Sequence, residues 1–154
     1  MSFSIRSSVF EPGGQISELY TCDDRGISPP LEWVDPPDGT RSFALVCDDP
    51  DAPGGTWVHW VLYGLPGSAL SLPENLPSAQ RLDDGSRQGQ NDFGRIGYGG
   101  PCPPRGRKHR YFFRLFALDT ELSLSPGLTG KGLEQAMAGH VLGRAELMGT
   151  YGSR

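Results

Sequence analysis

Two short polar segments, each followed by a histidine, are the places where this chain could do chemistry. The first holds Asp49 and Asp51 on either side of Pro50, and His59 follows it inside an apolar stretch. The second is a proline-rich turn that leads to His109 and Tyr111. Proline fixes φ and restricts the residue before it, so both segments predict stiff turns that hold side chains in set directions. Together they predict a small preformed polar pocket for an anion.

In the first segment, the chemistry depends on what His59 contacts. A buried imidazole without a partner costs about 1–3 kcal/mol, so this histidine needs a hydrogen bond. The preceding turn offers a carboxylate, and we expect Asp49 to be the partner. The alternative is a structural turn beside a core histidine that bonds a backbone carbonyl. Burial and a neighbouring carboxylate act in opposite directions on the imidazole, which leaves its charge open.

In the second segment, small and rigid residues precede the histidine. Gly100 lets the backbone approach a ligand closely, and Pro101 stiffens the wall. His109 and Tyr111 are two residues apart, so they share one face of a strand and could together hold a phosphate oxygen. Four basic residues predict a positive rim that steers anions: Arg105, Arg107, Lys108 and Arg110. The alternative is a solvated run of charge at a loop end.

Other functions are open to the same residues. Cys102 lies in the second segment, but no helix start or base nearby predicts an activated thiol. Asp49, His59 and His109 could instead form a metal site of a hydrolase or lyase, although the basic rim would repel a cation. A third alternative is regulation of a kinase or protease through the long Gly- and Pro-rich segment 64–109. We expect a binding protein that is not an enzyme, with no cofactor and no metal.

Composition limits the class of protein. The chain has 154 residues, which predicts one domain over 1–154, and its 22 Gly and 14 Pro favour a turn-rich β fold. A net charge of −4 argues against a nucleic-acid partner. No segment has the length and apolar character of a membrane span or a signal peptide, which predicts a cytoplasmic protein. The odd count of three cysteines, without CxxC spacing, predicts that all are reduced.

Hydrophobic patterns predict the elements that position these residues. Strands are expected near 3–8, 31–34, 42–47, 56–65, 110–118 and 145–151. A helix is expected over 133–141, with Thr129 as a possible cap and Gly143 as its stop. Strict alternation in the 56–65 strand places four side chains on one face: Trp57, His59, Val61 and Tyr63.

The order and spacing of these segments resemble the phosphatidylethanolamine-binding proteins, also called Raf kinase inhibitor proteins, in their bacterial and archaeal branch. The motifs that carry the resemblance are 49–53, 57–60, 91–98, 100–104 and 109–111. The resemblance implies a mainly β fold of two antiparallel sheets, a Greek-key β-sandwich with one short helix near the C-terminus.

The resemblance also implies a site. Its ligand-binding residues would be Asp49, His59, His109 and Tyr111, walled by Pro53, Gly100 and Pro101. Family members bind phosphate and phosphorylethanolamine-like groups there, some regulate kinases or proteases, and bacterial members form homodimers. This chain has a very short insert between the Asp-Pro motif and its histidine and lacks the eukaryotic C-terminal extension, which argues against a kinase partner.

Overall fold

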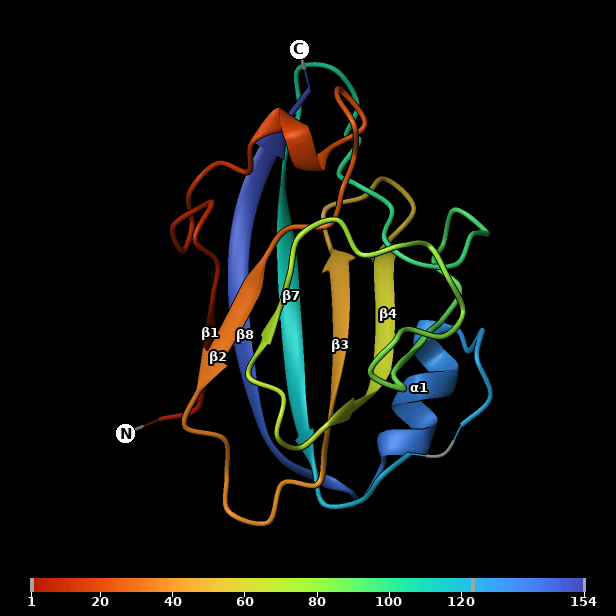
Figure 1. The fold of residues 1–154 in the computed structure, drawn as a ribbon. Coiled ribbons are helices and arrows are strands. Elements are labelled where there is room, and N and C mark those ends of the chain that lie inside the picture. Colours follow the sequence, from red (N-terminus) through yellow and green to blue (C-terminus); the bar gives the residue numbers. More distant parts are fainter. Residues whose placement is uncertain (1, 123, 154) are drawn as a thin grey trace.

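The computed structural model describes residues 2–122 and 124–153, which form two antiparallel β-sheets and a short helix (Figure 1). The larger sheet has the strand order β6-β4-β3-β7-β8. Its strands are β3 (Ser42–Asp49), β4 (Trp57–Pro66), β6 (Arg87–Gln88), β7 (Lys108–Leu118) and β8 (Val141–Gly152). After β4 the chain makes a long connection and returns as β7 beside β3, which is the Greek-key crossing. The predicted mainly β fold is confirmed.

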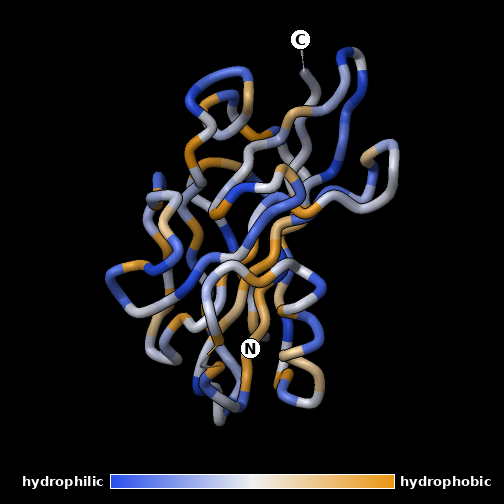
Figure 2. Tube along the Cα trace, turned by 90° about the vertical axis from the view of Figure 1, so that its right-hand side faces the viewer, coloured by the Kyte–Doolittle hydropathy of each residue, from blue (hydrophilic) through white to orange (hydrophobic). Residues whose placement is uncertain are grey.

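The smaller sheet lies in front of the larger one in Figure 1 and has the order β1-β2-β5. Its strands are β1 (Ser4–Arg6), β2 (Leu31–Val34) and β5 (Ser71–Leu72), and a 3-10 helix, η1 (Glu18–Tyr20), follows β1. Trp33, Phe43 and Trp60 are fully buried between the two sheets. Hydrophobic segments run through the middle of the molecule, and hydrophilic ones lie in peripheral loops (Figure 2). This packed core holds the ends of β3, β4 and β7 in place.

Helix α1 (Gly130–Met137) covers the other face of the larger sheet through Leu133 and Met137. Thr129 caps it by accepting a hydrogen bond from the Gly132 amide at 3.1 Å. The predicted C-terminal bound was wrong, because the helix stops before Gly139, whose φ of 82° is the left-handed conformation that ends helices. None of the helices in the described ranges has the length and apolar character that crossing a bilayer requires.

A β-bulge in β4 overturns the predicted alternation of its side chains. The pairing with β3 shifts between Cys47 and Asp48, which face Trp60 and Val58, so β4 carries an extra residue at His59. Val58 and Val61 therefore both pack on the helix side, whereas His59 contacts the ring of Tyr111 on the other side. Bulges commonly re-aim a side chain beside a functional site. Here the bulge separates His59 from Val61, with which it was predicted to share a face.

Candidate functional site

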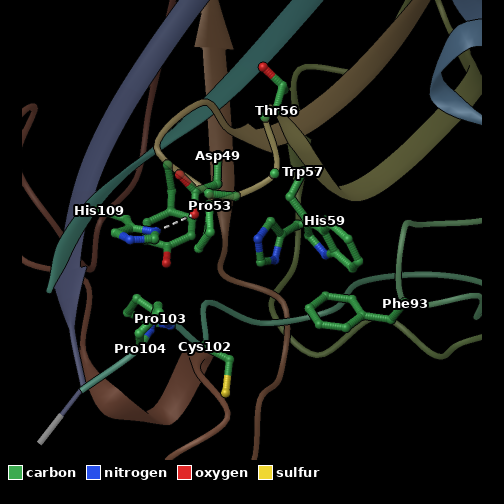
Figure 3. A pocket seen from close by; sticks show the side chains of 14 residues that line it. Asp49, Pro53, Thr56, Trp57, His59, Phe93, Cys102, Pro103, Pro104 and His109 are labelled. Atoms are coloured by element: carbon green, nitrogen blue, oxygen red, sulfur yellow. Dashed lines mark hydrogen bonds and ion pairs between the residues drawn. The ribbon is translucent and has the colours of Figure 1, made fainter.

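A cavity of about 370 Å³ lies where β3 ends and β4 and β7 begin (Figure 3). That volume is within the range of sites that hold small organic ligands. Most lining side chains are apolar or lack a side-chain charge, and a few polar groups converge among them. The lining residues central to the site are Asp49, Pro53, Trp57, His59, Phe93, Pro103, Pro104, His109 and Tyr111.

Asp49 and His109 form a buried hydrogen-bonded pair in the cavity wall. Nδ1 of His109 donates to Oδ2 of Asp49 at 2.7 Å, and both side chains are almost fully buried. The prediction that Asp49 contacts His59 was wrong. Asp49 is the last residue of β3, and β7 pairs directly with β3, so the neighbouring strand brings His109 to the carboxylate. This bond leaves Nε2 of His109 as the nitrogen available to a ligand.

His59 bonds the backbone instead. Its Nδ1 donates to the Gly99 carbonyl at 2.6 Å, which is the structural alternative considered for this histidine. Burial lowers the pKa of His59 below its ordinary value, against the opposing effects of the Gly99 carbonyl and the Asp49 charge. The ring is therefore neutral near pH 7, with Nδ1 protonated and Nε2 carrying a lone pair. Its ring meets that of Tyr111 edge-on, with centroids 5.3 Å apart.

The hydroxyl of Tyr111 is buried in the cavity wall, and among the described side chains it has no hydrogen-bond partner. Burial raises the pKa of Tyr111 far above its usual range, and the charge of Asp49 and the approach of its carboxylate to the hydroxyl are smaller causes. That approach does not have the distance and angle of a formed hydrogen bond. The hydroxyl is therefore a donor at every physiological pH. A buried donor without an acceptor costs about 1–3 kcal/mol, so this hydroxyl lowers the stability of the folded protein.

The turn between β3 and β4 is held to the start of β7 by Asp51. Its carboxylate accepts three hydrogen bonds from Arg110, one from the backbone amide and two from the guanidinium, each at 2.9 Å. The side-chain bonds to Arg110 lower the pKa of Asp51 to about 2. The charge of Arg110 is therefore paired with Asp51, and the other residues of the predicted basic rim, Arg105, Arg107 and Lys108, lie outside this ion pair and are exposed.

Gly100 and Pro101 lie behind the cavity wall, not among its lining residues. A Cβ on Gly100 would come within 2.7 Å of the Tyr20 carbonyl oxygen, so this glycine permits close approach of the N-terminal loop. The next residues, Cys102, Pro103 and Pro104, line the cavity. Pro53 lines it from the opposite turn, as the sequence predicts.

Cys22 and Cys102 form a disulfide across 80 residues of sequence. The prediction that all three cysteines are reduced was therefore wrong, and Cys47 alone among them is a free thiol, buried in the core. The pairing could not be read from spacing, because the two residues meet only through the fold. Disulfides generally persist in oxidising compartments, so this bond does not support the predicted cytoplasmic location, which stays a prediction.

Among the described residues, no three His, Cys, Asp or Glu side chains are grouped as metal ligands. Asp49, His59 and His109 all line the cavity, but both oxygens of Asp49 and Nδ1 of each histidine are already used in hydrogen bonds.

Comparison with known proteins places this chain in a family. Residues 6–152 match the family model described as phosphatidylethanolamine-binding protein. The chain belongs to this family. It is 53% identical over 148 residues to a UPF0098 protein of Methanothermobacter thermautotrophicus, covering 96% of this chain and 97% of the relative.

Two solved structures of the phosphatidylethanolamine-binding protein (PEBP) family are similar over the whole chain. CT736 of Chlamydia trachomatis, described as a PEBP homologue, has a TM-score of 0.90 and 40% identity, with 99% of both chains covered. YbcL of Escherichia coli, described as a new member of the mammalian PEBP family, has a TM-score of 0.91 and 32% identity, with 100% of both chains covered. The resemblance stated from the motifs is confirmed.

In this PEBP-family chain, one wall of the cavity was missed by sequence reasoning. Phe93 contacts the rings of His59 and Trp57, with centroids 5.3 and 5.5 Å apart. Phe93 and Trp57 are 37% and 38% exposed, which is high for aromatic residues. Buried Asn91 shapes the loop, since its Oδ1 accepts from the amides of Phe93 and Arg95. The signal was an Asn-Asp pair of the kind that starts a tight turn.

Proposed function

We propose that this chain is a non-enzymatic binding protein for small anions that carry a phosphate or a similar group. The observation that carries the proposal is the buried Tyr111 hydroxyl, a donor that forms no hydrogen bond with any described residue, in the wall of a cavity that both histidines line. An anion oxygen at this position would satisfy the hydroxyl. The neighbouring Asp49–His109 pair is already satisfied and acts as the support.

The protonation states suggest how a phosphate would fit. Neutral His59 offers a lone pair at Nε2, which can accept a hydrogen bond from the OH of a monoprotonated phosphate. Asp49 engages Nδ1 of His109, so Nε2 is the ring nitrogen that can contact the phosphate.

The size and lining of the cavity favour a ligand larger than inorganic phosphate. One water occupies about 30 Å³ of liquid, so a cavity of about 370 Å³ exceeds the space of a bare anion. The apolar wall around Trp57 and Phe93 would face the organic part of such a ligand. Phosphorylethanolamine is therefore the first organic probe to use.

Binding without reaction is the better match to these groups. Cys102 cannot serve as a thiolate while it is bonded to Cys22. Tyr111 keeps its proton because burial raises its pKa, so it is a poor nucleophile. Ligand binding requires only the hydrogen-bond donors and acceptors of these side chains and needs no nucleophile.

Isothermal titration calorimetry tests the proposal. Phosphate and phosphorylethanolamine are titrated into the wild type, into His109→Ala and into a control, His140→Ala, which changes an exposed histidine on the β7–β8 connection. We expect saturable binding to the wild type and the control, and a loss of affinity of at least about tenfold for His109→Ala. Equal binding by all three proteins, or binding by none, would refute the proposal.

A further inference from the structure

The Cys22–Cys102 disulfide links the wall of the cavity to a distant part of the chain. Cys102 lines the cavity between the two histidine-bearing strands, and its side chain is labelled in Figure 3 below His59 and Asp49. Both cysteines are exposed residues, whereas Cys47 is buried. Exposed disulfides are the ones that exchange readily with other thiols.

The bond ties the cavity wall to the N-terminal loop. The Cys22 amide donates to the Pro101 carbonyl at 3.1 Å, and the Tyr98 hydroxyl donates to the Tyr20 carbonyl at 2.7 Å. These contacts join the end of η1 and the residues just after it to the segment 98–102. Pro101, Pro103 and Pro104 have no amide hydrogen, so this stretch cannot be held by donating backbone hydrogen bonds from those positions.

The same stretch positions His59. The Gly99 carbonyl accepts from Nδ1 of His59, and the Gly99 amide donates to the His59 carbonyl at 2.8 Å. Gly99 is three residues from Cys102. A shift of the wall therefore reaches the histidine through its own hydrogen-bond partner.

We propose that the Cys22–Cys102 disulfide is a redox control of the anion pocket: the oxidised form holds the wall and His59 in the binding arrangement, and reduction releases them. This inference rests on the proposed binding function. It names a regulation of that site, with a cellular dithiol as the partner that delivers it.

The redox step is thiol–disulfide exchange. A thiolate of the dithiol attacks one cysteine sulfur, the S–S bond breaks, and the other cysteine leaves as a thiolate that takes up a proton. The second thiol of the reductant then attacks the mixed disulfide and frees the first cysteine. The protein gains two electrons and two protons, and the dithiol loses both as it becomes a disulfide.

The experiment compares oxidised and dithiothreitol-reduced protein by phosphate and phosphorylethanolamine titration, with thiol labelling to count free cysteines. Cys22→Ser breaks the bond without changing a cavity-lining residue, and Cys47→Ala is the matched control that keeps it. We expect reduction to weaken binding at least about fivefold in the wild type and Cys47→Ala. Cys22→Ser should bind with the affinity of the reduced wild type, and dithiothreitol should not change that affinity.

A ligand-free measurement separates this inference from the binding proposal. NMR of the ring of His59 and hydrogen exchange of the Gly99 amide report the wall directly. We expect shifted His59 signals and faster Gly99 exchange on reduction, with the core amides of β3 and β7 unchanged. If the oxidised protein binds neither probe, the binding function fails and the regulation of the anion pocket fails with it, even where these signals show that the wall has moved.

Three results would overturn the inference. The first is unchanged affinity, His59 signals and Gly99 exchange after confirmed reduction. The second is global unfolding on reduction, because the disulfide would then support the whole fold and not the pocket. The third is free thiols at Cys22 and Cys102 in protein purified without reductant.

Discussion

Nδ1 of His109 donates to the carboxylate of Asp49 at 2.7 Å, and this contact joins the end of β3 to the start of β7 inside the cavity. The two residues are 60 positions apart in sequence. The pair sets which nitrogen of His109 a ligand can reach, and it links the stability of this end of the sheet to the site.

The first prediction concerns this pair. Asp49→Ala leaves a buried imidazole N–H without an acceptor, so we expect a loss of about 1–3 kcal/mol in the free energy of unfolding, measured by urea denaturation. Asp49→Asn keeps an acceptor oxygen and should lose less. In a double-mutant cycle with His109→Ala, the two effects should not add, because each removes the same bond. Strict additivity would show that the contact contributes nothing.

The second prediction separates binding from stability at Tyr111. Tyr111→Phe removes a buried hydroxyl that has no partner among the described residues, so unfolding should become no easier, and stability can rise by about 1 kcal/mol. Phosphate affinity should fall about tenfold, because a hydrogen bond to a charged group is lost. Thermal unfolding and calorimetric titration of one preparation test both signs. A destabilised variant with normal phosphate binding would contradict the assigned role.

The third prediction concerns pH. Because burial lowers the pKa of His59 below its ordinary 6.5, the unfolded chain binds more protons than the folded one between the two pKa values. This contribution to stability is therefore complete above pH 6.5 and is lost as the pH falls through that window. Urea denaturation from about pH 8 to about pH 5 measures the slope.

The variant that checks this slope is His59→Asn, whose side-chain amide can still donate to the Gly99 carbonyl but does not titrate. Its stability should depend less on pH than that of the wild type. Gly54→Ala changes no titratable group, and its Cβ would meet nothing within 4 Å, so this control should keep the wild-type slope. The prediction fails if the two variants change the slope equally.

The fourth prediction concerns the glycines behind the cavity. Gly100→Ala places a Cβ 2.7 Å from the backbone oxygen of Tyr20, which cannot move aside easily, so we expect a loss of about 1–3 kcal/mol in unfolding free energy. Gly54→Ala is the matched control, since its Cβ would meet nothing within 4 Å. Denaturant unfolding compares the two. Equal stabilities of the two variants would show that the N-terminal loop moves away from the new Cβ without a loss of free energy.

Local patterns alone predicted much of this molecule. The alternation of β7 and the apolar run of β3 identified the strands that carry the site, because burial imposes a period of two on such segments. The motif order also identified the family. The end of α1 was placed too late because hydrophobic positions continue past Met137, whereas the backbone conformation at Gly139 ends the helix.

The sequence by itself therefore determined that two stiff turns and two histidines would meet an aromatic strand in a β-sandwich. Tertiary structure alone decided which histidine Asp49 contacts, that the bulge at His59 turns it toward Tyr111, and that Cys22 reaches Cys102. The physical reason is range. Propensity and periodicity act between neighbours in the chain, whereas a hydrogen-bond partner, a bulge or a disulfide is selected by strand register across tens of residues.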